Sequence, residues 1–132
     1  MATIAARKTY NPCVNFIALS IDYNTSNIGT ANMVQVGTLP AGCVLLNSVV
    51  SIVTVFNAAT TNVLIVGTAA DDDAYVASGD VDPGTLGGTL VPRSAGVYIA
   101  ADTPVYVKFT ETGTAASTGT AKVVVTFIPF VA

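Results

Sequence analysis

Apolar and polar residues alternate with a period of two along much of this chain, which is typical of β-strands. Residues 105–110 (VYVKFT) show the alternation most clearly and predict a strand with one inward face. No stretch of ten residues has the period of an amphipathic helix. The pattern therefore predicts an all-β protein.

About eight short elements are expected, separated by Gly, Pro, Asn, Asp and Thr. The turn after residue 39 has a physical basis, because Pro40 presets φ and Gly42 supplies a positive φ. Antiparallel strands at this spacing favour a β-sandwich of jelly-roll-like topology. The predicted elements are residues 14–22, 33–39, 43–56, 62–68, 97–100, 105–110 and 121–131, with a short helical turn or strand near 74–77.

Three of these elements carry a further expectation. Residues 14–19 are apolar on both faces, so this strand should be covered on both sides. Residues 43–56 form an unusually long run in which Asn47 and Ser48 indicate a bulge or bend. Pro129 near the end of the last run indicates an edge position or the exit of the strand.

Residues 69–92 have no clear period and contain five aspartates and four glycines. After the short element near 74–77, we expect an extended excursion over the surface. Long loops of this kind are uncommon in compact domains and are often functional.

The chain divides into an N-terminal arm, residues 1–12, and a single β-sandwich domain, residues 13–132. The arm holds the only adjacent basic pair, Arg7 and Lys8, and ends at Asn11-Pro12. It is interpreted either as a basic clamp onto a neighbouring subunit or as a frayed chain end.

Charge is scarce, because only 10% of the residues are charged while 52% are hydrophobic. Globular proteins usually contain about 25% charged residues. The uncharged surface is either a neutral polar exterior or is hidden against other subunits. We favour burial in a homo-oligomer, since permanent interfaces are depleted in charge.

The net charge of −3 argues against nucleic acid as a partner, because binding a phosphate backbone requires clustered Lys and Arg. No apolar run is long enough to cross a membrane, and the N-terminus does not have the charge order of a secretory signal. The chain is therefore expected to be made in a cytoplasm and kept there or released by lysis.

Catalytic residues are not predicted. The chain has no His to serve as a base for a Ser or Cys nucleophile, and Gly84, Gly87 and Gly88 lack the lysine and helix of a phosphate-binding loop. We expect no enzymatic activity and no cofactor.

One polar cluster deserves weighing as a metal site. Calcium binds six to eight oxygen ligands, and several aspartates lie within residues 71–82. The spacing does not match an EF-hand, so a solvated turn is favoured over a Ca²⁺ or Mg²⁺ site. The candidate ligands are Asp71, Asp72, Asp73, Asp80 and Asp82.

The two cysteines, Cys13 and Cys43, are interpreted as small buried apolar residues, with a disulfide or a reactive thiol as alternatives. Five scattered tyrosines are expected to pack in a core or interface. Stacking of tyrosines on sugar rings is the alternative.

Five segments within residues 33–78 resemble small virion structural proteins of tailed bacteriophages, of the head decoration (cement) type. They are residues 36–42 (VGTLPAG), 47–50 (NSVV), 56–57 (FN), 62–69 (NVLIVGTA) and 73–77 (DAYVA). The resemblance implies a β-sandwich on the capsid exterior, commonly a homotrimer at a local threefold axis. Its partner would be the major capsid protein, and no catalytic residue is implied.

Under this resemblance, residues 1–12 and the loop of residues 80–92 are expected to make contacts between subunits. The alternatives are a receptor- or glycan-binding module of a phage tail or fibre, and a tail or head-completion component. The candidate interface residues are Arg7, Lys8, Tyr10, Asp82, Pro83, Leu86, Leu90 and Arg93.

Overall fold

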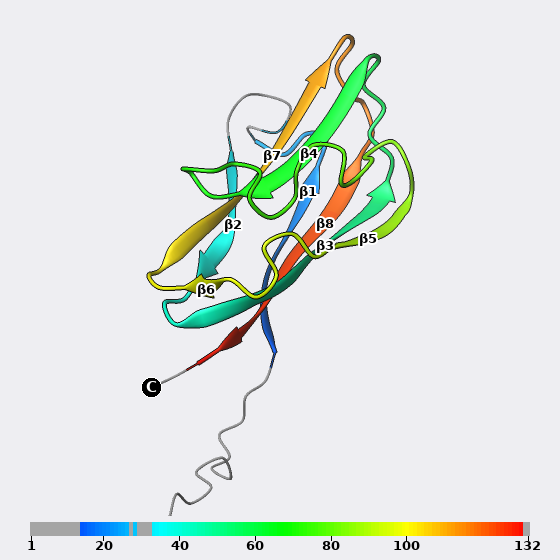
Figure 1. Ribbon diagram of the computed structural model, residues 1–132. Helices are drawn as coiled ribbons and strands as arrows, with labels where there is room; N and C mark the ends of the chain where they lie inside the picture. Colours follow the sequence, from blue (N-terminus) through cyan, green and yellow to red (C-terminus); the bar gives the residue numbers. More distant parts are fainter. Residues whose placement is uncertain (1–13, 27, 29–32, 131–132) are drawn as a thin grey trace, which may run out of the picture.

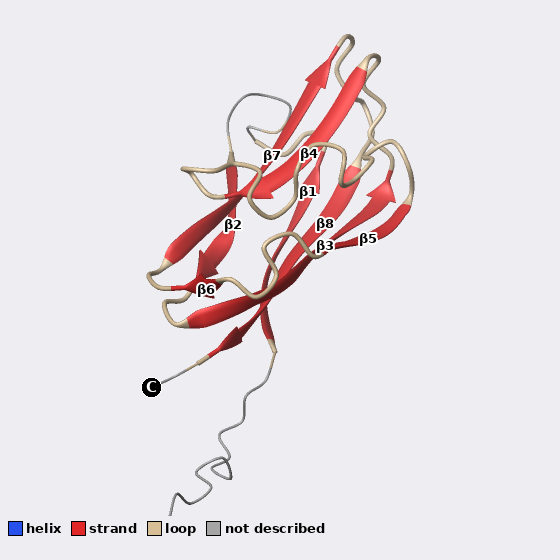
Figure 2. Cartoon of the chain, viewed as in Figure 1, coloured by secondary structure: helices blue, strands red, loops and turns tan. Residues whose placement is uncertain are grey.

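The computed structural model describes residues 14–26, 28 and 33–130, and within these ranges the chain forms strands and loops with no helix (Figure 2). The predicted all-β class is confirmed. No helix in the described ranges is long and apolar enough to span a membrane. The strands are β1 (Asn15–Asp22), β2 (Val34–Leu39), β3 (Cys43–Thr54), β4 (Thr61–Gly67), β5 (Gly87–Val91), β6 (Tyr98–Ile99), β7 (Thr103–Thr112) and β8 (Thr120–Pro129).

The strands form two antiparallel sheets that pack face to face (Figure 1). The five-stranded sheet has the order β1-β8-β3-β5, with β6 also pairing with β3, and the three-stranded sheet has the order β2-β7-β4. The pairing is nested, because β1 pairs with β8, β2 with β7 and β3 with β6. Nested pairing of this kind is the jelly-roll arrangement, which confirms the predicted sandwich.

The core lies between the sheets and is filled by the inward residues of each alternating strand. On β7, Val105, Val107 and Phe109 are fully buried, as the period of two predicted. The Phe109 ring packs against Phe56, which follows β3, with 4.5 Å between the ring centroids.

The bulge predicted in the long third strand is present. The register of β3 against β8 shifts between Leu45 and Asn47. The Thr126 hydroxyl on β8 donates a hydrogen bond to Asn47 Oδ1 at 2.7 Å, which holds the irregular position. Pro129 is the last residue of β8, an inner strand, so the prediction of a strand exit is correct and the edge alternative is not.

The prediction that the first strand is covered on both sides is wrong for this chain. β1 is an edge strand whose inward side carries Ile17, Leu19 and Ile21, while Phe16 on the other side is 64% exposed. Apolar residues on both faces were interpreted as burial in the sandwich. Here the second apolar face is the outer surface of the sheet.

The excursion expected after residue 77 is only partly irregular. Residues 87–91 form β5, which pairs with β3 from Ile52↔Gly87 to Ser48↔Val91. Its two leading glycines hide the strand pattern, because glycine is unfavourable in strands and has no side chain to alternate. Around residue 76 the structure has two isolated β-bridges, Val66↔Val76 and Ser78↔Val81.

Candidate functional site

The outer face of the five-stranded sheet carries a row of apolar side chains that crosses four strands. Ala18 on β1 is paired with Val124 on β8, Val124 with Val49 on β3, and Val49 with Leu90 on β5. Directly paired residues of antiparallel strands lie on the same face, so the row is continuous. Leu90, at its end, is 61% exposed.

Further apolar residues extend this row toward the end of the sheet where β1 begins and β8 finishes (Figure 1). Phe16 precedes Ala18 on the same face, and Val44 is paired with both Ile128 and Tyr98. We call the whole surface the apolar sheet face. It comprises Phe16, Ala18, Val44, Val49, Leu90, Tyr98, Val124 and Ile128.

Charge on this side of the sheet is confined to the opposite end. Among the outward residues of the paired strands, Lys122 is paired with Ser20 and Asp22 with Thr120. The Lys122 ammonium donates a hydrogen bond to Ser20 Oγ at 3.2 Å. The outer surface of the five-stranded sheet therefore has a charged end and a longer uncharged part, in which the hydrogen-bonded pair Thr126 and Asn47 separates the row of Val124 from the row of Ile128.

The outer face of the three-stranded sheet also carries both polar and apolar residues. Val63 is paired with Thr110, and Ile65 with Lys108. The Lys108 ammonium also lies 3.1 Å from a carboxylate oxygen of Asp72.

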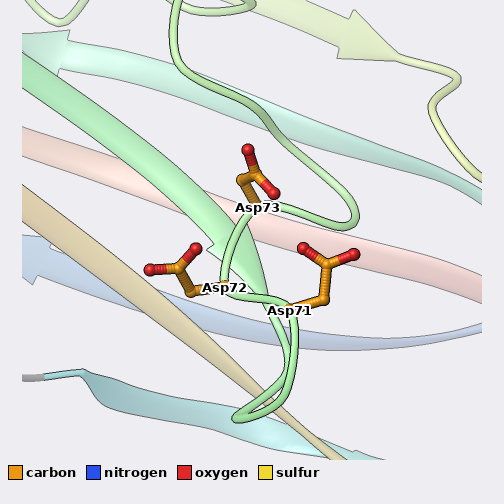
Figure 3. A group of neighbouring side chains, drawn as sticks. All are labelled: Asp71, Asp72 and Asp73. Carbon is orange, nitrogen blue, oxygen red and sulfur yellow. The ribbon is translucent and has the colours of Figure 1, made fainter.

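Asp71, Asp72 and Asp73 stand on one turn after β4, and the Asp72 carboxylate points to the opposite side of the turn from that of Asp71 (Figure 3). One carboxylate oxygen from each can lie within 4.8 Å of the others. The pKa of Asp73 is raised, chiefly by a hydrogen bond with Asp71 and further by partial burial and the neighbouring negative charges. The turn concentrates negative charge at one point of the surface.

Backbone hydrogen bonds within this turn explain its shape without a metal ion. The Thr68 N–H donates to the Asp71 carbonyl at 2.8 Å, and the Asp71 N–H donates to Thr68 Oγ1 at 3.1 Å. Asp72 already has a polar partner in the Lys108 ammonium. A cation site at Asp71, Asp72 and Asp73 has no support beyond the cluster itself.

The other two candidate ligands lie outside that group. Asp80 forms a two-pronged ion pair with Arg93, with Nε–Oδ2 at 2.9 Å and Nη2–Oδ1 at 3.1 Å. This pairing lowers the pKa of Asp80. Asp82 accepts hydrogen bonds from Thr85 Oγ1 and the Gly84 N–H, which lower its pKa too. Both carboxylates organise the loop that leads into β5.

The candidate interface residues of this loop have different environments. Leu86 and Leu90 are more than 60% exposed, and Leu90 belongs to the apolar sheet face. Arg93 is held by Asp80, and the buried Pro83 accepts a hydrogen bond from the Phe56 N–H through its carbonyl. The proposed contacts of Arg7, Lys8 and Tyr10, and of the whole arm of residues 1–12, lie outside the described residues.

Cys43 is fully buried, which raises the pKa of its thiol. Its surroundings agree with the interpretation as a small apolar residue. Cys13 lies outside the described residues, so a bridge between the two stays an untested alternative. Two of the tyrosines are exposed, Tyr23 at 41% and Tyr98 at 62%, whereas Tyr75 is buried.

A shallow hollow of about 410 Å³ lies at the end of the sheet opposite the charged end, between the β2–β3 turn and the end of β8. Its aromatic residues are Tyr98 and Phe130, both more than 60% exposed. The rest of the lining is formed by Pro40, Ala41, Gly42, Ala100 and Pro129. Phe130 is attached to the turn by a backbone hydrogen bond to the Gly42 carbonyl at 3.3 Å.

Sequence reasoning selected only Leu90 from the apolar sheet face. The signal that could have found the rest is the apolar character of both faces of the first, third and last predicted strands. For residues 14–19, the signal was interpreted as coverage of the strand on both sides. Which strands share one outer face depends on the pairing of segments as distant as β1 and β8.

Comparison with solved structures shows three with the same jelly-roll fold. A chain of the cyanophage Pam1 capsid asymmetric unit has a TM-score of 0.75 and 23% identity, and the match covers 98% of this chain and 94% of that one. A chain of the capsid of Helicobacter pylori bacteriophage KHP30 has a TM-score of 0.60, 12% identity and coverages of 87% and 86%. A chain of the Ralstonia phage GP4 capsid has a TM-score of 0.53 and 15% identity, and the match covers 94% of this chain and 91% of that one.

These likenesses establish a shared fold over nearly the whole length of each chain. No protein-family model and no curated protein matches the sequence. The class defined by the fold is a compact jelly-roll sandwich of the kind present in these three phage capsid structures.

Proposed function

We propose that this chain is a non-enzymatic structural protein of a phage virion, which decorates the capsid exterior and stabilises it by bridging neighbouring capsid subunits. The observation that carries the proposal is the end-to-end likeness to a chain of the Pam1 capsid asymmetric unit. The match extends over 98% of this chain and 94% of that one.

The chemistry of the chain supports the same role. The absence of His and the charge content of only 10% leave few groups for catalysis. The apolar sheet face offers contact area, and several modest contacts made at once produce tight attachment to a shell. The partner would be the major capsid protein, and the site of action the outside of the virion.

Purified virions test the proposal most directly. Cryo-EM of the particle should show this chain on the outer surface of the head. Its copy number on a stained gel should be of the same order as that of the major capsid protein. A few copies per particle would instead identify a tail or head-completion component, and absence from the particle would refute the virion role.

The arm can be tested separately on particles that lack this protein. Full-length chain should bind to them, and a chain lacking residues 2–10 should not, because the arm is proposed to clamp a neighbouring subunit. A matched control replaces the exposed Gln35 on β2 with Ala and should bind normally. Equal occupancy by the deleted chain would remove the arm from the proposal.

The hollow at Tyr98 and Phe130 favours one rival, a glycan-binding module of a tail or fibre. Exposed aromatic rings beside a hollow can stack on the apolar faces of sugar rings. A glycan array would show specific binding that Tyr98→Ala abolishes if this rival is correct. A blank array together with binding to heads would favour decoration.

A further inference from the structure

The hollow beside the β2–β3 turn exposes two aromatic rings to water. Tyr98 is 62% exposed and Phe130 is 61% exposed, and Pro40 and Pro129 also line the hollow. Aromatic side chains carry a large apolar area, so rings left in water favour a contact that covers them. The volume of about 410 Å³ is at the lower end of the range of ligand pockets, about 300–1,000 Å³. A few side chains of an extended segment would fill it.

The chain that precedes β1 leaves the sheet beside this hollow. Asn15, the first residue of β1, is paired with Phe127, and Phe130 follows three residues further along the chain. Because β1 and β8 are antiparallel, the backbone traced back from Asn15 to Val14 heads toward the end of β8 (Figure 1). Three residues of strand span about 10 Å, and an extended backbone of about six residues spans about 20 Å. The N-terminal arm therefore starts within reach of the hollow of its own subunit.

A carboxylate stands at the rim of the hollow. Asp102 accepts a hydrogen bond from the Ala41 N–H at 2.9 Å, and Ala41 is one of the lining residues. The arm contains Tyr10 and, close to it in sequence, the only adjacent basic pair of the chain, Arg7 and Lys8. One short stretch thus carries an aromatic ring for the hollow and two positive charges for its acidic rim.

We propose that the N-terminal arm of the free chain, which lies outside the described residues, docks on the hollow of its own subunit. The Tyr10 ring then covers the exposed aromatic side chains, and Arg7 and Lys8 lie beside Asp102. A tethered segment has an effective concentration in the millimolar range, so a weak contact is populated within one chain. A weak contact also exchanges readily, which leaves the arm available to a neighbouring subunit on a particle. The inference concerns the chain in solution and does not rest on the virion role.

Amide NMR spectra of the isotope-labelled full chain and of a chain lacking residues 2–10, both reduced, test the contact. Deletion of a docked arm should shift the signals of the hollow and leave those of the β7–β8 hairpin unchanged. Tyr10→Ala should produce the same shifts, and it keeps the test decisive if the deleted chain does not fold. Tyr23→Ala, at a 41% exposed tyrosine just after β1, is the matched control and should leave the hollow signals in place. The reporting residues of the hollow are Ala41, Gly42, Ala100 and Phe130.

The charge at the rim is tested by Asp102→Asn, which keeps an oxygen that can accept from the Ala41 N–H. Exposed ion pairs are weak, so this variant should lower the docking equilibrium constant only about two- to fivefold. The hollow signals should accordingly move part of the way to their positions in the deleted chain. Asp22→Asn is the matched control, because Asp22 also accepts a hydrogen bond, from the Thr120 hydroxyl, at the opposite end of the sheet.

A mixed sample separates docking within one chain from docking on a neighbour. Isotope-labelled chain lacking residues 2–10 is refolded together with unlabelled full chain, and its hollow signals should stay at their positions in the deleted chain. Movement toward the full-chain positions would overturn the inference in favour of a neighbour's arm. Identical hollow signals in the full and deleted chains would also overturn it. So would a Tyr10→Ala variant that keeps the full-chain signals, or a Tyr23→Ala control that shifts them equally.

Discussion

Gly67, at the end of β4, lies where a single added methyl group would collide with the backbone of the acidic turn. A Cβ atom there would lie 2.5 Å from the carbonyl carbon of Asp72 and 2.8 Å from the Ala74 nitrogen, and closer still to the Asp71 carbonyl oxygen. Favourable contacts between such atoms lie near 3.5–4.0 Å. All three neighbours are backbone atoms, so no side chain can rotate away.

The cost of Gly67→Ala follows from this geometry. Overpacking of a well-packed site costs about 1–3 kcal/mol. A turn displaced by roughly 1 Å would also weaken the hydrogen bond from the Val66 N–H to the Val76 carbonyl, now 3.0 Å, and each such loss costs about 0.5–1.5 kcal/mol. We therefore expect the free energy of unfolding to fall by about 2–4 kcal/mol.

Urea unfolding at a fixed subunit concentration measures this change. Far-UV circular dichroism is the suitable signal, since the chain has no Trp. Gly88→Ala in β5 is the matched control, because a Cβ there meets nothing within 4 Å. Its stability should change by less than about 0.5 kcal/mol or rise slightly. Equal stabilities of the two variants would refute the close packing of the acidic turn on β4.

Three other substitutions probe the sandwich and its loops. Phe109→Ala removes a fully buried ring that packs on Phe56 and should cost about 3–5 kcal/mol in urea unfolding; a loss below about 1 kcal/mol would contradict the described core. Gly119→Ala should be strongly destabilising by the same assay, because Gly119 has φ +144° and a Cβ would lie 2.6 Å from two atoms of the Phe56 ring and closer still to a third. Wild-type stability would show that this contact does not exist. The pKa of Asp80 is lowered mainly by its hydrogen bond with Arg93. The pair therefore stabilises the fold at pH values above the ordinary carboxyl pKa of about 3.9, and this stabilisation is lost as the pH falls through the lowered pKa. Asp80→Asn should accordingly lower the free energy of unfolding by about 0.5–1 kcal/mol at pH 7, a small effect because Arg93 is exposed, and should have no effect near pH 2. An equal loss at both pH values would show that the effect does not come from the charge.

Strand positions were predictable where the alternation was clean. The inward set of β7 followed directly from the spacing of Val105, Val107 and Phe109. β5 was missed because Gly87 and Gly88 carry no side-chain pattern, and it exists because its backbone completes the hydrogen bonds of β3. Local propensity gave no indication of that distant partner.

The candidate sites were less predictable than the strands. The five aspartates looked like one cluster because they lie close in sequence. In the fold, Arg93 binds Asp80, while Asp82 accepts hydrogen bonds within its own turn. These partners are separated from the first three aspartates by the course of the loop, which sequence spacing alone does not describe.

The sequence by itself determined the all-β class, the inward side of β7 and the scarcity of charge. These properties depend on residue type and on a period of two, and both are local. Only the tertiary structure decided that Ala18, Val124, Val49 and Leu90 stand in one row. Register and neighbour order arise from hydrogen bonds between segments up to about a hundred residues apart, so the outward residues of single strands become one apolar surface only when the sheet has formed.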